Sequence, residues 1–495
     1  MTGAIDPRTP VLVGVGTAAG SGAEEASDLM AAAVLAAAAD AGVPGLASRA
    51  DRIGVPQGTW SYPDPARLVA AAVGARGART CLVEVGVPQQ ALVNQALASI
   101  VAGRSDVAVV VGGEAKARAD AARRAGSDAP ETAQPGAVPD AVVRRPGPVV
   151  DAVEVATGLW EPVVQYAMID SALRAAEEQT VGAHRAGIAR LWERFNQVAA
   201  ANPAAAFGTR RTAGEIDTPG PGNRLLAFPY NKWHATQWGV DQAAALLLCA
   251  AEVAEDAGVS RDRWVFPLVA LESSHAVSLL RRAQPWRWPA MEVLGRATAA
   301  HLGRPVAEVE VAEVYSCFPA AVRVQQRALG LDPDGTPTVT GGMTFAGGPF
   351  NNFTYQALAA VVARLRADPG SLGMVTTVSG LLTKPGIGVW GTHPPGAPPL
   401  VADLAATAEL ATDVVPAFDA LDAYSGPGVV VAYTVTPSPG APPPAGPGRT
   451  VVLADTPGAM RAVATCEEQA LAERAMAEEL VGVPVHLEQG SFRLA

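Results

Sequence analysis

The chain has 495 residues, of which 49% are hydrophobic and 17% charged, a composition typical of a well-buried globular protein with about two to four domains. Its net charge of −11 and its lack of a basic run argue against nucleic acid as a partner, because binding to phosphates requires a Lys/Arg footprint. The four cysteines form no CxxC pair, no apolar stretch could span a bilayer and no secretory pattern is present, so we expect a reduced, cytoplasmic protein without a metal site or membrane contact.

In the first 114 residues, short apolar runs alternate with helical patterns. This alternation predicts βαβ units and a mostly parallel sheet. The expected strands are Val11–Gly16, Arg52–Pro56, Cys81–Val87 and Val107–Gly112. The expected helices between them are Asp28–Ala41 with Ser27 as N-cap, Pro65–Val73, and Gln89–Ala102.

Residues 115–240 break this alternation. Arg118–Pro148 is rich in Ala, Arg and Pro and resembles a surface excursion. Two helices are expected at Pro162–Ala176 and Val181–Ala201, followed by the loop Pro219–Trp238, which is dense in Pro, Gly and aromatic residues. The helices and aromatic residues favour an ordered, inserted subdomain over a disordered one.

The alternation then resumes, which makes the second block similar to the first in its order of elements. The expected helices are Asp241–Ala257, Met291–Leu302, Pro319–Leu329 and Asn352–Ala367. The expected strands are Val265–Leu271, Ala307–Tyr315, Thr338–Thr340 and Leu372–Val378.

A Pro/Gly/His stretch, Gly391–Pro399, separates this core from a tail. The tail is expected to be a small β-rich domain with one helix at Val463–Glu479 and a flexible segment at Pro437–Gly448, compatible with an OB-like barrel. Its expected strands are Val429–Val435, Thr450–Leu453, Val483–Leu487 and Ser491–Leu494.

Three local sequences give the core a more specific character. In Gly86–Glu114, GVPQQALVNQALASIVAGRSDVAVVVGGE, a small-residue turn leads into a helix, an Asp-containing turn and a strand that ends in Gly-Gly-Glu. In Val309–Phe318, VEVAEVYSCF, a strand precedes a helix that ends in Ala-Leu-Gly-Leu. The third sequence is Thr340–Phe353, TGGMTFAGGPFNNF, and a shorter fourth motif is Val378–Gly380.

In order and spacing these motifs resemble the thiolase superfamily, and best of all the sterol-carrier-protein-type thiolases, which are acetyl-CoA acetyltransferase-like. The resemblance covers roughly residues 8–395. It implies an α/β thiolase fold of two similar βαβαβαββ halves in five αβαβα layers, with an inserted loop subdomain. The expected domains are an N-terminal half at 1–265 that includes the insertion at 115–240, a second half at 266–400, and an additional β-rich, OB-like domain at 401–495.

The resemblance also indicates which positions correspond to the catalytic groups of a thiolase. A thiolase uses a nucleophilic cysteine activated by a histidine, and a second thiol that handles the α-carbon proton. The matched positions hold Gly86 for the nucleophile, Gly348 for the histidine and Ser379 in the last motif, which removes the usual covalent chemistry. Tyr315 and Cys317 remain as candidates for proton transfer, and the expected helix N-terminus would lower the pKa of the Cys317 thiol.

Each of these candidates has a plainer structural interpretation. Cys317 could equally be a small buried residue of the core, and Tyr315 an ordinary half-buried tyrosine without a role in proton transfer. Ser379 could have a purely structural role at the end of a strand. Cys81 cannot replace the missing nucleophile, because it lies five residues before Gly86 on the same expected strand, about 16 Å away and on the opposite face.

The inserted region of thiolases binds CoA, so the resemblance implies CoA contacts near its end. Lys232 would contact a phosphate and Trp233 would stack on adenine, whereas the alternative is a loop held in place by its own aromatic residues. The expected substrate- or CoA-binding residues are Lys232, Trp233, His234, Phe345, Gly347 and Asn352.

Taken with the motifs, these residues predict a thiolase-like protein that acts on or binds an acyl thioester of CoA or of a carrier protein. Any chemistry would be non-covalent Claisen- or aldol-type carbon–carbon bond formation or cleavage. The alternative is a catalytically inactive acyl-CoA-binding or partner protein. No permanently bound cofactor is expected, since CoA would be substrate or ligand, and both a homodimer and a monomer remain open.

Overall fold

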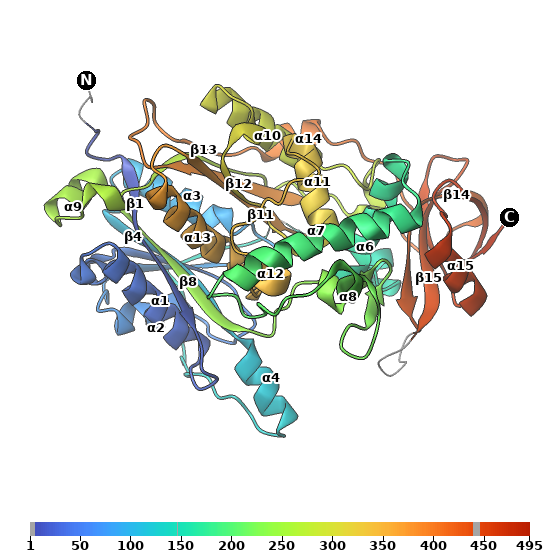
Figure 1. Cartoon of the computed structure of the whole chain (residues 1–495), viewed down its shortest axis with the longest axis horizontal. Helices are drawn as coiled ribbons and strands as arrows, with labels where there is room; N and C mark the ends of the chain where they lie inside the picture. Colours follow the sequence, from blue (N-terminus) through green and yellow to red (C-terminus); the bar gives the residue numbers. More distant parts are fainter. Residues whose placement is uncertain (1–4, 146, 439–445) are drawn as a thin grey trace.

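Two stacked β-sheets form the centre of the protein (Figure 1). The computed structural model describes residues 5–145, 147–438 and 446–495. The first sheet has the strand order β1-β8-β4-β2-β3-β5, with β1 Pro10–Ala19, β8 Asp241–Ala250, β4 Val107–Ala115, β2 Arg52–Pro56, β3 Arg79–Val83 and β5 Ala141–Val143. The second sheet has the order β10-β11-β12-β9-β13, with β10 Val311–Glu313, β11 Leu372–Ser379, β12 Lys384–Gly391, β9 Phe266–Glu272 and β13 Leu400–Asp403.

Helices cover both sheets and fill the space between them (Figure 1). The first sheet carries α1 (Ala26–Asp40) and α2 (Pro65–Ala72) on its outer face, and α9 (Ala251–Asp256) follows β8. The central layer contains α3 (Gln90–Val101) and α13 (Phe353–Ala367), which contact strands of both sheets. The outer layer of the second sheet contains α10 (Pro289–Leu302), with α11 (Pro319–Leu329) and α14 (Ala405–Leu410) beside it. The result is the expected five-layer αβαβα arrangement.

The inserted subdomain is ordered and mainly helical. Its helix α6 packs against α11 of the core and also against the C-terminal domain, so it joins the two (Figure 1). Its elements are α4 Lys116–Arg124, α5 Ala152–Ala156, α6 Pro162–Ala176, α7 Val181–Ala201, α8 Ala213–Asp217, β6 Leu225–Ala227 and β7 Tyr230–Asn231, and the short α12 Gly342–Phe345 of the core packs on α7.

The C-terminal domain is a closed five-stranded barrel with the order β14-β15-β16-β18-β17. In chain order this is 1-2-3-5-4, with one helix between the third and fourth strands, and β16 and β18 are parallel. That is the topology of the OB-fold, so the OB-like expectation is confirmed. The elements are β14 Ser425–Pro437, β15 Pro447–Asp455, β16 Arg461–Cys466, α15 Gln469–Ala477, β17 Pro484–Glu488 and β18 Ser491–Leu494.

The expected helix at Asp241–Ala257 is wrong over its first ten residues, which form strand β8. Alanine and leucine favour helices, but β8 pairs with β1 on one side and β4 on the other and is buried from Gln242 to Ala250. These pairings and this burial outweigh the intrinsic preference of the residues.

Four smaller expectations also differ from the structure. Thr338–Thr340 is not a strand, because the N–H groups of Val339 and Thr340 donate to the Glu313 carboxylate. The N-cap of α1 is Glu25 rather than Ser27. The first residues of the expected helix at Val463–Glu479 belong to β16, and the expected strand Cys81–Val87 ends at Val83.

The additional domain begins later than residue 401. The strand β13, Leu400–Asp403, is paired with β9 at the edge of the second sheet, and the first barrel strand begins at Ser425. The expected flexible segment Pro437–Gly448 includes residues 439–445, which lie outside the described residues.

In the described part of the chain, no helix combines the length and the apolar character that crossing a membrane requires.

Candidate active-site cavity

A cavity of about 570 Å³ brings together residues from distant parts of the chain. Gly86 follows β3, Tyr315 precedes α11, and Ser379 ends β11, and all three line this cavity. Three of the five positions matched to thiolase chemistry therefore share one wall, whereas Gly348 and Cys317 are not part of it.

Most of the remaining wall is apolar. Trp160 and Val85 line the cavity with 53% and 37% of their surfaces exposed, so apolar surface is available to a ligand at its mouth. Phe350 and Leu381 add to this surface. Among the described residues that line the cavity there is no cysteine, histidine or carboxylate, so none of them is a thiol nucleophile or a base with a pKa near neutrality.

Gly86 lies in a turn rather than on a strand. Its φ of +96° is in the left-handed region, which a side chain at this position would strain. Cys81, on β3, is buried within hydrogen-bonding distance of Gln95 in α3, and burial raises the pKa of its thiol. Cys81 does not line the cavity, in agreement with its exclusion as a replacement nucleophile.

Tyr315 is fixed from several sides. Its backbone N–H donates to Thr376 Oγ1 at 2.8 Å, its carbonyl accepts from Gln325, and its ring meets Phe353 edge-on. Burial raises the pKa of the Tyr315 hydroxyl, so the group is protonated at neutral pH and can donate a hydrogen bond. The Gln89 side chain lies near this hydroxyl and donates to Asn351 Oδ1 at 3.2 Å.

Cys317 has the opposite pKa shift from the one expected. Burial raises the pKa of its thiol to about 12, and this effect outweighs any contribution from the N-terminus of α11. The thiol lies near Tyr166 on α6, whose ring stacks on Phe318. Cys317 is thus a neutral thiol packed among aromatic residues behind the cavity.

Gly348 has no room for a side chain. A Cβ atom there would lie 2.2 Å from the Thr236 methyl carbon Cγ2 and 3.2 Å from the Met343 carbonyl oxygen. Thr236 also donates from its N–H and its hydroxyl to the Cys317 carbonyl, both at 3.0 Å. A residue of the inserted subdomain therefore occupies the space that a histidine at position 348 would need.

The expected CoA-binding residues are mostly buried. His234 is 0% exposed, its Nδ1 accepts the N–H of Asn231, and burial lowers the pKa of its imidazole to about 3. Trp233 packs against the Arg211 guanidinium and stacks on Phe345, while Gly347 and Asn352 are buried too. Lys232 alone among the six is exposed. A role of these residues in CoA binding stays a prediction, and the packing of His234 and Trp233 supports the structural alternative.

Lys384 is a residue of this region that the sequence did not indicate. It begins β12, opposite Ser379 of β11, and its Nζ donates to the Gly86 carbonyl oxygen at 2.7 Å. The sequence offers little indication that Lys384 lies near the cavity, because this residue precedes a proline and a glycine in a segment that was not expected to be a strand. Thr236 was missed because only the three-dimensional fold brings it next to Gly348.

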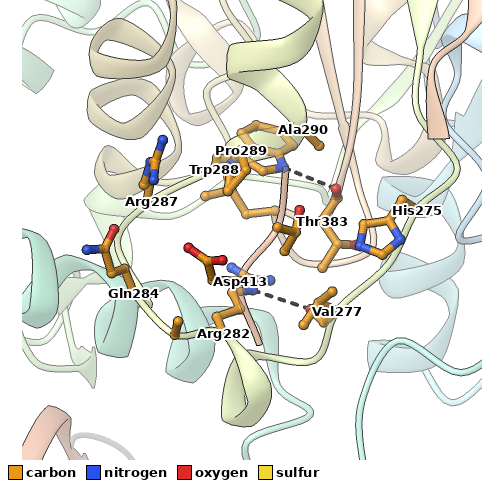
Figure 2. A pocket seen from close by; sticks show the side chains of 13 residues that line it. His275, Val277, Arg282, Gln284, Arg287, Trp288, Pro289, Ala290, Thr383 and Asp413 are labelled. Atoms are coloured by element: carbon orange, nitrogen blue, oxygen red, sulfur yellow. Dashed lines mark hydrogen bonds between the residues drawn. The ribbon is translucent and has the colours of Figure 1, made fainter. Parts of the chain in front are cut away.

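A second pocket, of about 40 Å³, lies behind the β11–β12 turn (Figure 2). Figure 2 shows His275, Arg282 and Asp413 around it, with Trp288 donating to the Thr383 carbonyl. Arg282 donates to the Leu381 carbonyl at 2.7 Å, and burial lowers the pKa of its guanidinium to about 10. This volume suits a few water molecules and not an acyl group, so we assign the pocket a supporting role for the turn.

Comparisons by sequence find no matching protein family and no matching curated protein. Solved structures do match. A monomeric SCP2-thiolase-like protein type 1 from Mycobacterium smegmatis matches with a TM-score of 0.81 and 26% identity, over 99% of this chain and 100% of its own. The Ltp2–ChsH2(DUF35) aldolase matches with a TM-score of 0.57 and 20% identity over 77% and 98% of the two chains. An acetyl-CoA acetyltransferase from Syntrophomonas wolfei matches with a TM-score of 0.54 and 17% identity over 78% and 100%.

The last two likenesses concern the fold alone, and they agree with the five layers described above. The protein has the thiolase fold, as its motifs predicted. The first likeness extends through the C-terminal barrel and is stronger. This likeness, together with the fold, supports an SCP2-thiolase-like protein of the thiolase superfamily, in agreement with the family expected from the sequence.

Proposed function

We propose that the cavity beside Gly86 receives the acyl part of a thioester of CoA or of a carrier protein. The protein would promote Claisen- or aldol-type carbon–carbon bond chemistry without a covalent acyl-enzyme. The supporting observation is a cavity of about 570 Å³ that offers a tyrosine hydroxyl and no thiol. Glycine at position 86 cannot form a thioester, whereas the protonated Tyr315 hydroxyl can donate to a carbonyl oxygen on which negative charge develops.

A second candidate function is binding without catalysis. It is favoured by the lack of a cysteine, histidine or carboxylate among the described residues that line the cavity, because carbon–carbon bond chemistry also needs a proton acceptor. Cys317, the other predicted proton-transfer group, has a thiol pKa of about 12 and would be a poor acceptor as it stands.

The C-terminal barrel of the same chain would serve as the protein partner of the thiolase-like core. The similar Ltp2–ChsH2(DUF35) aldolase combines Ltp2 with a DUF35 protein, and we infer that the fused barrel here takes the place of a separate partner chain. In support, the described strand edge of β3 is covered by β5, so it is closed to pairing with a second copy, and the similar Mycobacterium smegmatis protein is described as monomeric.

Calorimetric titration with acetoacetyl-CoA and free CoA tests the binding part of the proposal. Saturable binding of the thioester supports it, and no binding of either compound contradicts it for CoA-linked substrates. Carrier-protein thioesters would then be titrated in the same way, and failure of both classes would refute the proposal.

Turnover of β-ketoacyl and β-hydroxyacyl thioesters separates the two candidate functions. Tyr315→Phe should lower kcat/KM by about 10²-fold, the usual size of a lost proton donor, with little change in the Kd for the thioester. Tyr424→Phe, directly before the first barrel strand, is the matched control, and Cys317→Ala tests the second predicted group. Binding without turnover in the unaltered protein would support the binding function, and turnover that survives both active-site substitutions would refute the proposed chemistry.

A further inference from the structure

Two cations flank the cavity without a carboxylate partner among the described residues. Arg145 lines the cavity, and its Cδ lies 3.5 Å from the position of a Cβ built on Gly86. Its side chain forms no hydrogen bond or ion pair within the described part of the chain. The neighbouring Arg144, in contrast, forms an ion pair with Glu84 at 2.8 Å. The nearby carboxylate, that of Glu84, is therefore paired with Arg144. The Arg145 guanidinium remains available to a ligand.

The second cation, Lys384, is held behind the wall. Its side chain is fully buried, and its one hydrogen bond to a described residue is the one to the Gly86 carbonyl at 2.7 Å. Its Cε lies 3.4 Å from the position of a Cβ built on Gly380. Gly86 and Gly380 both line the cavity, so the Lys384 side chain lies against two residues of its wall.

The turn that holds Lys384 is strained. Gly380, Leu381 and Leu382 all have positive φ angles, of 60°, 58° and 63°. For leucine this is an unfavourable conformation, and such conformations persist where the surrounding structure enforces them, often at functional sites. Arg282 supports the turn through its bond to the Leu381 carbonyl.

A buried ammonium is costly unless a counter-charge accompanies it. Burial, and after it the positive charge of Arg145, lower the pKa of Lys384. The surroundings of the Lys384 side chain therefore destabilise its protonated, charged form. No carboxylate lines the described wall of the cavity. An anion in the cavity would supply the missing counter-charge to both side chains, and across a wall of low dielectric constant its attraction to Lys384 would be only weakly screened.

We propose that the acyl group taken by this protein carries a carboxylate, which the cavity binds beside Arg145, with the Lys384 ammonium behind the wall as a second positive charge. This inference rests on the proposed function and narrows its substrate class from acyl thioesters in general to thioesters of dicarboxylic acids. The methylene groups of such an acyl chain would contact Trp160 and Phe350, which form apolar parts of the same wall.

Calorimetric titration of the full-length protein with glutaryl-CoA and pentanoyl-CoA tests this inference. The two acyl chains have equal numbers of carbon atoms and differ in a terminal carboxylate. Glutaryl-CoA should bind at least roughly tenfold more tightly, as expected for a charge-assisted contact. In Lys384→Met and in Arg145→Gln this preference should fall towards one, while the Kd of pentanoyl-CoA stays within about threefold, since no contact with an uncharged chain is lost.

Arg123→Gln, an exposed substitution on α4, is the matched control and should retain the full preference. Circular dichroism of each variant establishes whether it is folded. If the buried Lys384→Met variant does not fold, the comparison of Arg145→Gln with the unaltered protein still decides the test. Equal affinities for the two thioesters in the unaltered protein would overturn the inference and leave the proposed function standing. A preference that survives both substitutions would also overturn it, whereas failure of both ligands to bind would count against the proposed function itself.

Discussion

At Gly348 the methyl group of Thr236 fills the position into which a side chain would extend. The hydroxyl of the same threonine bonds to the Cys317 carbonyl, so Thr236 connects two of the positions at which thiolase chemistry was expected. The space beside Gly348 is therefore filled by a neighbouring residue. A histidine side chain at position 348, which the resemblance to thiolases would lead one to expect, would meet an occupied space.

This contact gives a prediction for stability. Gly348→Ala should lower the free energy of unfolding by about 1–3 kcal/mol, the usual cost of overpacking a buried site, as measured by urea denaturation. Thr236→Ser removes the methyl group and keeps the hydroxyl, so the double variant should regain part of the loss. An unchanged free energy of unfolding in Gly348→Ala would contradict the prediction and would show that the loop can move to accommodate the added methyl group.

Buried carboxyl groups should make the stability depend on pH. Burial, and after it the Asp403 charge, raise the pKa of Glu272 from 4.5 to about 8, and burial raises that of Glu114 to about 7. Because the folded-state pKa values lie above the unfolded ones, the folded protein binds more protons, and this contribution to stability is present below pH 4.5 and is lost as pH rises through 7 and 8.

The free energy of unfolding should therefore decrease between about pH 6.5 and pH 8.5, above the range in which the buried His234, with a pKa lowered from 6.5 to about 3, makes the opposite contribution. Urea denaturation at several pH values measures it. Glu272→Gln retains the Asn94 contact to the side-chain oxygen and should flatten the profile at its upper end. The exposed variant Glu467→Gln should leave the profile unchanged. A stability that rises with pH over this range would contradict the prediction.

At the level of elements, the short strand β5 covers the edge of β3 in the first sheet. Its three residues pair in parallel with β3, from Ala141 opposite Cys81 to Val143 opposite Val83. An open β3 edge would offer unpaired backbone groups to a second copy of the sheet. The segment expected to be a surface excursion thus covers the edge of β3 and leaves the three-residue β5 as the outermost strand.

We expect the protein to be monomeric at micromolar concentrations, with a mass near 50.5 kDa by light scattering after size-exclusion chromatography. Val142→Pro should weaken the cover, because proline disfavours a paired strand, and increase self-association. Val138→Pro, outside β5 and 75% exposed, is the control. A stable dimer of the unaltered protein would contradict the prediction.

The elements also show where sequence patterns suffice. The helices α3, α6, α7, α11 and α13 follow the expected ranges closely, because their apolar spacing and end signals are local. The strand β8 was not predictable from its alanines and leucines, since its strand state depends on β1 and β4. The strand β12 was missed because its Pro385 and three glycines give a weak strand signal.

The same distinction applies to the candidate site. Gly86, Tyr315 and Ser379 were found because each belongs to a motif with a recognisable local order, and the structure brings them to one cavity. Lys384 and Thr236 were not found, because their importance arises from contacts with Gly86 and Gly348 that are distant in sequence.

On the scale of the whole molecule, the barrel and the inserted subdomain share an interface. The Phe228 N–H donates to the Val435 carbonyl at 2.8 Å, and Phe228 packs within the hydrophobic core of the barrel. Arg174 of α6 is fully buried, donates to Glu479 at 2.7 and 2.9 Å, and donates to the Tyr433 hydroxyl at 2.8 Å. This contact should couple the unfolding of the barrel to that of the core.

Glu479→Ala leaves the Arg174 charge buried without its carboxylate and should cost about 1–3 kcal/mol. We expect differential scanning calorimetry to resolve two transitions in this variant and one in the unaltered protein. Glu478→Ala removes the adjacent exposed ion pair with Arg474 and should leave a single transition. A single, unshifted transition in Glu479→Ala would mean that the ion pair does not couple the two parts.

The covalent connection between core and barrel also bears on how tightly they need to bind. The segment from α14 to β14 keeps the barrel within reach of α6 at all times, which corresponds to an effective local concentration of about millimolar for a short tether. An interface with an intrinsic affinity that would dissociate readily between separate chains is then almost always closed. Core and barrel are also produced in a fixed one-to-one ratio, so the complete assembly forms without any requirement for matched expression of two genes.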